Sequence, residues 1–197
     1  MNKLMVMGFL LAINASPSVA RAAEWTVDKS HSQITFTVSH MVISEVSGTF
    51  AAFDVQIEAE NDDLTGGSLT AIIKTASINT GIDRRDNHLR SDDFFNAEKY
   101  PEITFKSTRI AKIGDGKYTI EGNLTIRDIT KPVAFDAVLN GTIKTDKSLR
   151  SGWKATLAIN RFDYGLHWNR TIETGGLVAG DTVHIAVNIE IIKPLNS

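Results

Sequence analysis

The residues of this chain whose types and spacing suggest chemistry are concentrated in residues 83–93, which read DRRDNHLRSDD. An imidazole, three guanidinium groups and four carboxyl groups lie together here, and such groups serve in metal binding and acid–base catalysis. On a helix, however, His88 shares a face with Arg84, so a metal ion would meet a fixed positive charge. The pattern therefore predicts no metal site.

The other charged residues of this segment are explained by helix structure. Asp86 and Arg90 have the spacing of an acid–base pair on one face of a helix. Ser91 suits the N-cap of a second short helix, residues 92–100, whose first turn is acidic and which Pro101 ends. We interpret the segment as two short helices that cover one end of the fold and pack apolar side chains against it. These side chains are Leu89, Phe94 and Phe95.

Nucleophilic catalysis would need a hydroxyl or thiol group beside a base. The chain has no cysteine, which excludes thiol catalysis and cysteine-bound zinc or iron–sulfur centres. Serine precedes histidine at Ser30-His31 and at Ser39-His40, but adjacent residues of a strand point to opposite faces, so neither pair is expected to form a dyad. We predict no catalytic residue.

Most of the remaining sequence alternates between apolar and polar residues, with glycine-rich turns between the alternating runs. This period of two is typical of antiparallel strands with one buried face. The pattern predicts an all-β fold, an eight-stranded antiparallel barrel with a short helical insertion at residues 82–99 and a long loop at residues 161–180. The expected strands lie within residues 32–40, 53–58, 68–75, 103–106, 118–126, 133–139, 153–159 and 183–191.

The same alternation predicts which side chains face the interior. His40 has the parity of Ile34, so we expect it inside near a strand end, as a hydrogen-bonded core histidine or as a group that orients a ligand. His184 has the opposite parity to its apolar neighbours and is expected to face outward. The inward set is rich in Phe and Ile. From these residues alone, a filled interior and an apolar pocket both stay open.

The first 22 residues have the features of a secretory signal peptide. Lys3 precedes an apolar run at residues 4–13, which is too short to span a bilayer, and Ala20-Arg21-Ala22 offers a cleavage pattern. We expect cleavage after residue 22, one domain in residues 23–197, and export. The net charge of -2 argues against nucleic-acid binding, and no later segment is apolar enough for stable membrane insertion.

Several motifs, in this order along the chain, resemble the YceI family of bacterial secreted proteins. The quoted stretches are VDKSHSQITFTVSHM (27–41), GTFAAFD (48–54), RRDNHLRSDDFFNAEKYP (84–101), GNLTIRDITKPV (122–133), FDYGLHWN (162–169) and ETGGLVAGDTV (173–183). The resemblance implies a lipocalin-like extended barrel with a long hydrophobic pocket for a polyisoprenoid chain, such as an isoprenoid quinone. It also implies a periplasmic location, no established catalytic activity and no cofactor other than the bound lipid.

Binding of such a lipid would use inward apolar side chains for the tail and a few polar or aromatic groups for the head. The predicted ligand-binding residues are Ile34, Phe36, Val38, His40, Phe53, Arg85, His88, Leu89, Phe94, Phe95, Phe105, Phe135, Trp153 and Trp168. The leading hypothesis is a periplasmic carrier or sequestering protein. The alternatives are an enzyme that modifies an isoprenoid lipid, acting through Arg85, Asp86 and His88 or through the His40 region, and a ligand-free envelope stress protein. Homodimer formation stays open.

Overall fold

The computed structural model describes residues 23–171 and 177–195, so the expected signal peptide lies outside the described residues. Most of the described chain is β-strand, as the alternating sequence predicts. The strands are β1 (Ala23–Val27), β2 (Gln33–His40), β3 (Ser44–Phe50), β4 (Phe53–Ala59), β5 (Ser68–Lys74), β6 (Ile78–Asn79), β7 (Glu102–Gly114), β8 (Lys117–Ile126), β9 (Ile129–Lys144), β10 (Ser148–Asn160) and β11 (Ala179–Pro194). The helices are α1 (Asp83–Arg90) and the 3-10 turns η1 (Lys29–His31), η2 (Thr75–Ser77) and η3 (Arg161–Tyr164).

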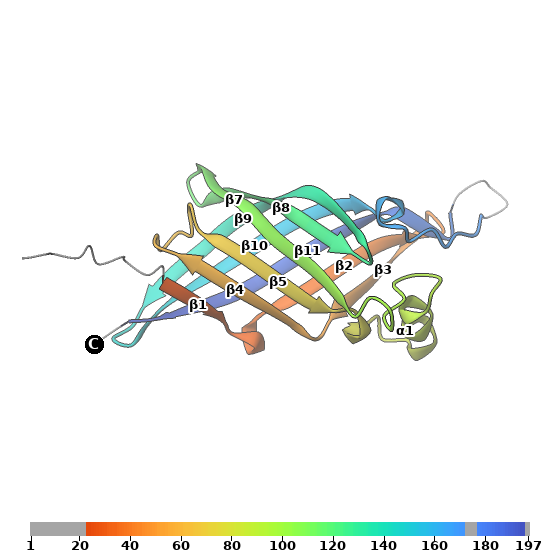
Figure 1. Ribbon diagram of the computed structural model, residues 1–197, viewed down its shortest axis with the longest axis horizontal. Helices are drawn as coiled ribbons and strands as arrows, with labels where there is room; N and C mark the ends of the chain where they lie inside the picture. Colours follow the sequence, from red (N-terminus) through yellow and green to blue (C-terminus); the bar gives the residue numbers. More distant parts are fainter. Residues whose placement is uncertain (1–22, 172–176, 196–197) are drawn as a thin grey trace, which may run out of the picture.

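Eight of these strands form a closed antiparallel barrel, which confirms the predicted fold class. Their order around the barrel is β1-β4-β5-β7-β8-β9-β10-β11, and the pairing of Thr26 with Ile192 closes the ring. Figure 1 shows an elongated barrel with α1 at one end and the C-terminal end of β11 at the other. We call these the α1 end and the far end.

The strands β2 and β3 extend the wall of the barrel at the α1 end. β2 pairs with both β11 and β3, and it follows β1 after the short turn η1. In the same way, β4 follows β3 after a bend at Ala51 and Ala52. Sequence alternation did not indicate β3, because it carries Gly48 where apolar residues would be expected. A Cβ at Gly48 would lie 2.4 Å from the Phe36 ring, so glycine permits this close approach.

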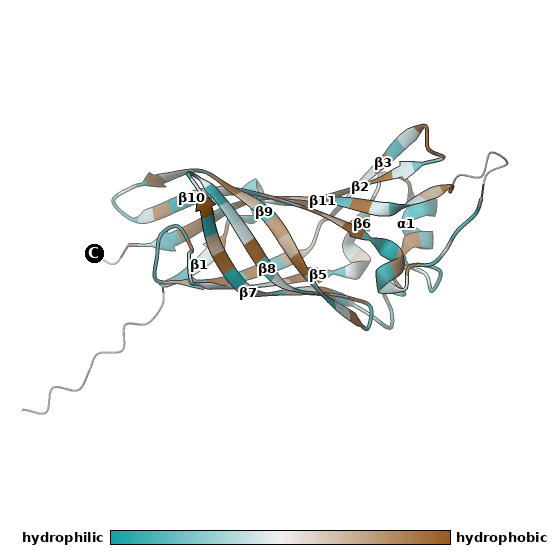
Figure 2. Ribbon diagram, turned by 90° about the horizontal axis from the view of Figure 1, so that it is seen from above, coloured by the Kyte–Doolittle hydropathy of each residue, from teal (hydrophilic) through white to brown (hydrophobic). Residues whose placement is uncertain are grey.

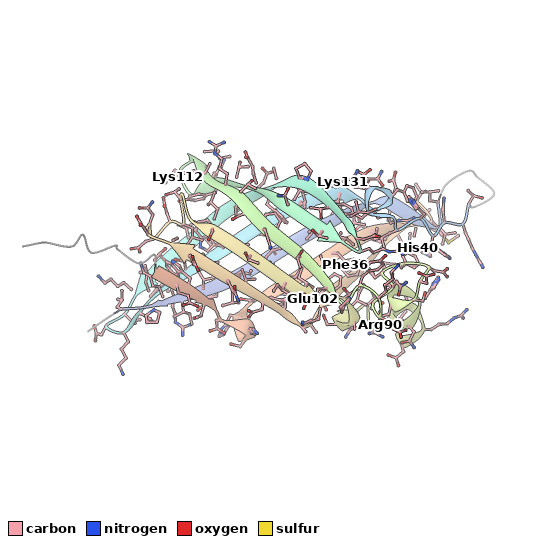
Figure 3. The ribbon with its side chains drawn as sticks, viewed as in Figure 1. Phe36, His40, Arg90, Glu102, Lys112 and Lys131 are labelled. Carbon is pink, nitrogen blue, oxygen red and sulfur yellow. The ribbon has the colours of Figure 1, made fainter. Side chains whose placement is uncertain are left out.

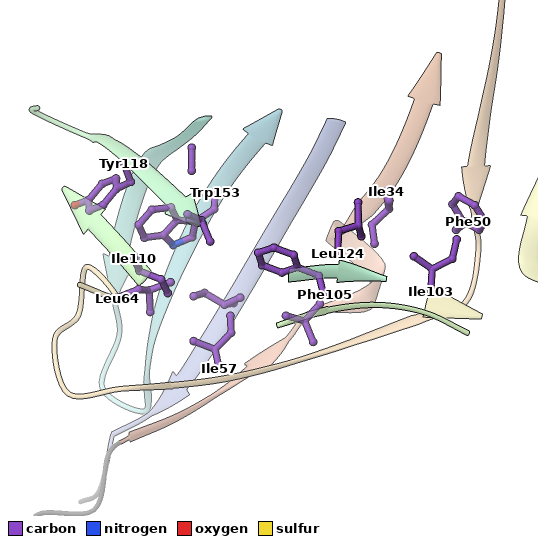
Figure 4. Close-up of a cluster of buried hydrophobic side chains, with 14 of the residues drawn as sticks. Ile34, Phe50, Ile57, Leu64, Ile103, Phe105, Ile110, Tyr118, Leu124 and Trp153 are labelled. Atoms are coloured by element: carbon purple, nitrogen blue, oxygen red, sulfur yellow. The ribbon is translucent and has the colours of Figure 1, made fainter. Parts of the chain in front are cut away.

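The far end of the barrel is filled by large side chains. Trp25, Tyr118 and Ile191 are almost completely buried there, and the Tyr118 and Trp153 rings meet edge to face with centroids 4.9 Å apart. Figure 4 shows Tyr118 and Trp153 in one group, with Phe105, Ile103 and Phe50 farther along the interior. The far end is therefore solid core, held by apolar burial and aromatic packing.

The predicted second helix, residues 92–100, is wrong. α1 is the one α-helix among the described residues, and the following stretch is a series of turns. The Phe95 amide donates to the Leu89 carbonyl and the Ala97 amide donates to the Arg90 carbonyl, so the chain folds back on α1. Ser91 ends α1, with its hydroxyl donating to the His88 carbonyl, instead of starting a new helix.

The predicted pair of Asp86 with Arg90 is also wrong. The Asp86 carboxylate is buried and accepts hydrogen bonds from the amide and hydroxyl of Thr80, at 2.9 and 2.5 Å. Arg90 donates instead to the carbonyls of Ala76 and Ile78, both at 2.8 Å. Each side chain satisfies backbone groups in the stretch from η2 to α1, where unpaired groups would cost more than an exposed ion pair contributes. The two side chains thereby tie α1 to the preceding residues 76–80.

Gly122 of β8 allows a close contact that shapes the interior, and it provides a test of the packing. A Cβ there would lie 2.4 Å from the Lys106 carbonyl oxygen and 2.5 Å from the Phe105 ring. We expect Gly122→Ala to lower the free energy of unfolding by roughly 1–3 kcal/mol, because ring and backbone must move. Gly141→Ala in β9 is the matched control, since nothing lies within 4 Å of its Cβ position. Equal urea midpoints for the two variants would contradict this packing.

Candidate functional site

The half of the barrel next to α1 holds a cavity of about 340 Å³. Its wall is formed by inward side chains from both sides of the barrel and is almost entirely apolar. Representative wall residues are Ile34, Val55, Phe105, Leu124, Phe135 and Ile185. Phe105 and Phe135 meet edge to face with centroids 5.2 Å apart. A concave apolar space with few polar groups is typical of a small-molecule binding site.

The cavity is long rather than compact. On β11 its wall runs from Ala179 to Ile189, which corresponds to roughly 30 Å along the strand at about 3.3 Å per residue. Two small wall residues, Ala71 and Ala155, leave space across the barrel between larger neighbours. The shape therefore suits an extended apolar chain better than a compact molecule.

Twelve of the fourteen predicted ligand-binding residues line this cavity. They are Ile34, Phe36, Val38, His40, Arg85, His88, Leu89, Phe94, Phe95, Phe105, Phe135 and Trp168. Figure 3 shows Phe36 and His40 near α1, at the same end as Arg90. His184 is exposed, as expected from its parity. Ligand contact by the twelve residues stays a prediction.

Phe53 and Trp153 do not line the cavity. Trp153 packs against Tyr118 in the core of the far end. Phe53 lies at the bend between β3 and β4 and borders a separate groove with Lys29 and Asp54. Alternation predicts the face on which a side chain lies, but it does not predict its depth along the barrel or its place at a bend. Both residues are therefore removed from the candidate site.

An aromatic cluster covers the cavity at the α1 end. The His88 ring contacts the rings of Phe94 and Trp168 edge-on, with centroids 5.1 and 5.2 Å away, and its Nε2 lies 2.8 Å from Asp93 Oδ2. Phe95 meets Phe50 at 6.0 Å. The segment after α1 thus contributes rings to the cavity wall. His88, Phe94 and Trp168 form a mutual cluster, because the Phe94 and Trp168 rings also meet, with centroids 5.3 Å apart.

Arg127, at the turn between β8 and β9, connects two parts of the cover. Its Nη1 donates to the carbonyls of Phe94 and Gly165, at 3.2 and 3.1 Å. One guanidinium group therefore joins the segment after α1 to the segment after β10.

Polar groups on the cavity wall are few and lie at the α1 end. Arg85 donates through Nε to the Thr80 hydroxyl at 2.7 Å and through Nη2 to the Thr80 carbonyl at 2.8 Å. His40 and Ser39 lie at the end of β2. The cavity therefore has an apolar interior and a polar end, which is the distribution that an amphipathic lipid requires.

Arg161 is a cavity residue that the sequence analysis missed. It is 3% exposed, and its guanidinium group donates to the carbonyls of Leu166, Trp168, Ala179 and Gly180. Burial lowers its pKa from the ordinary value. Within the described residues, no carboxylate forms a salt bridge with it. Its parity with Ile159, an inward residue of β10, was the signal that could have found it.

Ser30 and His31 do make contact, contrary to the sequence prediction. Ser30 Oγ lies 3.1 Å from His31 Nδ1, because residues 29–31 form the 3-10 turn η1 instead of a strand. The arrangement is not a catalytic triad, because Asp28 approaches the same imidazole nitrogen and also binds the Ser30 hydroxyl directly. These bonds, first from Ser30 and then from His31, hold the pKa of Asp28 well below its usual range.

Asp28 and His31, together with Glu190, also have atoms close enough to hold a metal ion. Arg150 donates to Asp28 Oδ2 at 3.3 Å and to Glu190 Oε1 at 2.5 Å. Because this guanidinium group already neutralises both carboxylates, the cluster is better explained as an ion-pair network that fastens η1 to β10 and β11.

The family model described as the YceI-like domain matches residues 25–191. The chain belongs to the YceI family. A UPF0312 protein of Staphylococcus aureus is 38% identical over 168 residues, which cover 84% of this chain and 95% of that protein. The described residues contain no helix of the length and apolar character needed to cross a membrane.

Solved YceI-type structures have the same fold. The Campylobacter jejuni YceI protein is 29% identical with a TM-score of 0.65, and the match covers 97% of this chain and all of that one. Burkholderia cenocepacia BcnA has a TM-score of 0.71 at 23% identity, over 83% of this chain and 98% of BcnA. A polyisoprenoid binding domain from Saccharophagus degradans has a TM-score of 0.64 at 17% identity, over 88% and 99% of the two chains. The similarities to BcnA and to the Saccharophagus degradans domain concern the fold alone.

The four carbonyl contacts of Arg161 predict a large effect of a conservative change. We expect Arg161→Lys to lower the free energy of unfolding by about 2–4 kcal/mol, because a compact ammonium cannot reach all four carbonyls. The control Lys131→Ala removes a partly exposed ion pair with Asp163 nearby. It should change the free energy of unfolding by less than about 1 kcal/mol. Urea denaturation measures both. Equal destabilisation by the two variants would contradict the role of Arg161.

The buried side chain of Tyr164, three residues after Arg161, should make the protein less stable at alkaline pH. Burial raises the pKa of Tyr164 to about 12, whereas an unfolded tyrosine titrates near about 10. The unfolded chain therefore loses its proton first, and the contribution of this group to stability falls as pH rises through that window. Over the same pH range, the free energy of unfolding measured by urea denaturation should fall less in Tyr164→Phe than in the wild type. Parallel pH profiles for the two proteins would contradict the assignment.

Proposed function

We propose that this protein binds one polyisoprenoid chain in its barrel cavity and acts as a carrier or store for an isoprenoid lipid or quinone. The observation that carries the proposal is the long cavity with an almost wholly apolar wall. An isoprenoid tail has no hydrogen-bonding groups, so its binding depends on removing apolar surface from water, at about 25 cal/mol per Å². The wall offers such a surface along most of its length.

The two ends of the cavity favour one orientation of the lipid. Trp25, Tyr118 and Trp153 fill the barrel beyond it, so the tail would extend toward this core. The head group would stay at the α1 end, near Arg85 and His88. Guanidinium and imidazole groups donate hydrogen bonds, which suits a head group with acceptor oxygens, such as a quinone carbonyl or a phosphate.

Two further observations support the proposal. The fold resembles a Saccharophagus degradans domain described as polyisoprenoid binding, although at 17% identity this likeness concerns the fold alone. The leader-like features of residues 1–22 favour export, and we infer a periplasmic location from them. No catalytic group, metal or cofactor other than the bound lipid is part of the proposed function.

An enzyme that acts on the same lipid is the second candidate, because His88 and Asp93 form a histidine–carboxylate pair beside the cavity. Within the described residues, the His88 imidazole has no hydroxyl group as a hydrogen-bond partner that could serve as a nucleophile. Its ring is packed edge-on against both Phe94 and Trp168, which explains the pair as part of the cover. Binding is therefore the function that the geometry supports better.

Blocking the cavity from one wall residue tests the proposed function. Ala155 of β10 lines the cavity, and Ala155→Phe would place a ring across it without adding a polar group. Ala158→Phe is the matched control, because Ala158 is exposed on the outer face of the same strand. Each protein is produced with its own leader in a bacterial host, purified, extracted with organic solvent and examined by mass spectrometry.

We expect an isoprenoid lipid or quinone in extracts of the wild type and of Ala158→Phe, and little of it in extracts of Ala155→Phe. Binding of an added isoprenoid quinone, followed by tryptophan fluorescence, should weaken about tenfold or more in Ala155→Phe. The proposal fails if neither assay finds an apolar ligand in the wild type. It also fails if Ala155→Phe folds and binds as well as the control.

A further inference from the structure

The hairpin between β2 and β3 ends in three consecutive exposed apolar residues. Met41 is 38% exposed, Val42 71% and Ile43 85%. We call residues 41–43 the hairpin tip. Figure 2 shows the hairpin projecting at the α1 end, with apolar colours at its tip. Single exposed apolar residues are ordinary, but adjacent ones at a projecting turn indicate a contact surface.

The tip has a backbone conformation that its residues disfavour. The Ile43 amide donates to the His40 carbonyl at 3.2 Å, which closes a β-turn with Met41 and Val42 in the centre. Their φ angles are 51° and 65°, a pattern typical of type I′ turns, in which Asn-Gly is strongly preferred. A β-branched valine is strained at positive φ. Apolar side chains are thus present where polar or small residues would stabilise the turn.

The hairpin tip lies directly beside the cavity. His40 and Val46, on the two strands of the hairpin, both line the cavity wall. The Met41 amide donates to the Val178 carbonyl at 3.0 Å, and Val178 is another wall residue. Ile82, which precedes α1 at this end, adds a further side chain that is 52% exposed. A surface that the tip contacts would therefore lie close to the polar end of the cavity.

The size and charge of the tip favour a lipid bilayer over a protein as its partner. A stable protein interface buries about 800 Å² on each partner, far more than three side chains can provide. The hairpin from Ser39 to Ser44 carries no acidic or basic side chain except His40. A bilayer needs neither a large area nor a matching shape, because apolar side chains insert individually into its interfacial region.

We propose that the hairpin tip inserts into a phospholipid bilayer and brings the α1 end of the barrel against the membrane surface. The attachment is weak and reversible, since three side chains offer less apolar surface than one acyl chain, which alone binds only marginally. Its role in loading or unloading a lipid rests on the proposed function. The docking itself does not, because it involves no residue of the cavity wall.

A variant that improves the turn while removing its apolar side chains tests the proposal. The triple change Met41→Asn, Val42→Gly and Ile43→Thr introduces the Asn-Gly pair that type I′ turns prefer. The hairpin should therefore be at least as stable as in the wild type. The control changes Ile113→Thr and Ile143→Thr remove two side chains that are 64% and 67% exposed at the far end.

The measurement is co-flotation with phosphatidylcholine vesicles, with and without phosphatidylglycerol, using protein freed of bound lipid. We expect the wild type and the far-end control to float with the vesicles, and the tip variant to partition about tenfold or more weakly. Because the driving force is apolar, added salt should have little effect. Ala155→Phe should float like the wild type even if it binds no isoprenoid, which separates failure of docking from failure of the proposed function.

The absence of cysteine allows a direct check of depth. A polarity-sensitive fluorophore on Val42→Cys should shift to the blue when vesicles are added, whereas the same label on Ile143→Cys should not shift. Docking is refuted if the tip variant floats like the wild type or if the two labels respond alike. It is also refuted if sedimentation velocity shows that the tip instead joins two copies of the chain.

Discussion

The guanidinium group of Arg161 organises the α1 end of the barrel by donating to four backbone carbonyls. These carbonyls belong to the segment after η3 and to the start of β11, two parts of the chain that a long connection separates. Arg127 has a similar role between Phe94 and Gly165. Carbonyl oxygens satisfy the donors of a buried cation without supplying a full negative charge, so this end of the cavity retains a positive character. That character favours a ligand whose polar end has acceptor oxygens.

The cavity exists because side-chain volume changes along the barrel while the backbone pattern does not. At the far end, inward positions carry Trp25, Tyr118 and Trp153, which fill the interior. Toward α1, inward positions of β5 and β10, on opposite sides of the barrel, carry Ala71 and Ala155, and the interior stays partly empty. An eight-stranded barrel is just wide enough to be filled by large side chains or to hold one small ligand. Whether a part of the interior is solid core or pocket therefore depends on the size of a few inward-facing residues.

The period of two was sufficient to predict an eight-stranded barrel and the inward faces of the strands that it indicated, because burial on one face imposes that period. It did not indicate β1, which closes the ring. Depth along the barrel was not predictable, since Trp153 has the same parity as the cavity residue Ala155 but lies in the core. The segment at residues 91–100 was misread because helical spacing does not show that the Phe95 amide bonds back to Leu89. A local sequence pattern contains no information on such tertiary hydrogen bonds.

On the proposed lipid binding and membrane docking, the energetics of the apolar cavity place selectivity at its polar end. An isoprenoid tail that leaves a bilayer for the cavity exchanges one apolar environment for another, so the hydrophobic effect contributes little to the exchange. The balance must then depend on the head group, which exchanges the bilayer interface for Arg85 and its neighbours at the α1 end. A nearly balanced exchange favours release as well as uptake. Polar groups along the whole length of the barrel would weaken binding, because the tail has no hydrogen-bonding groups that could satisfy them.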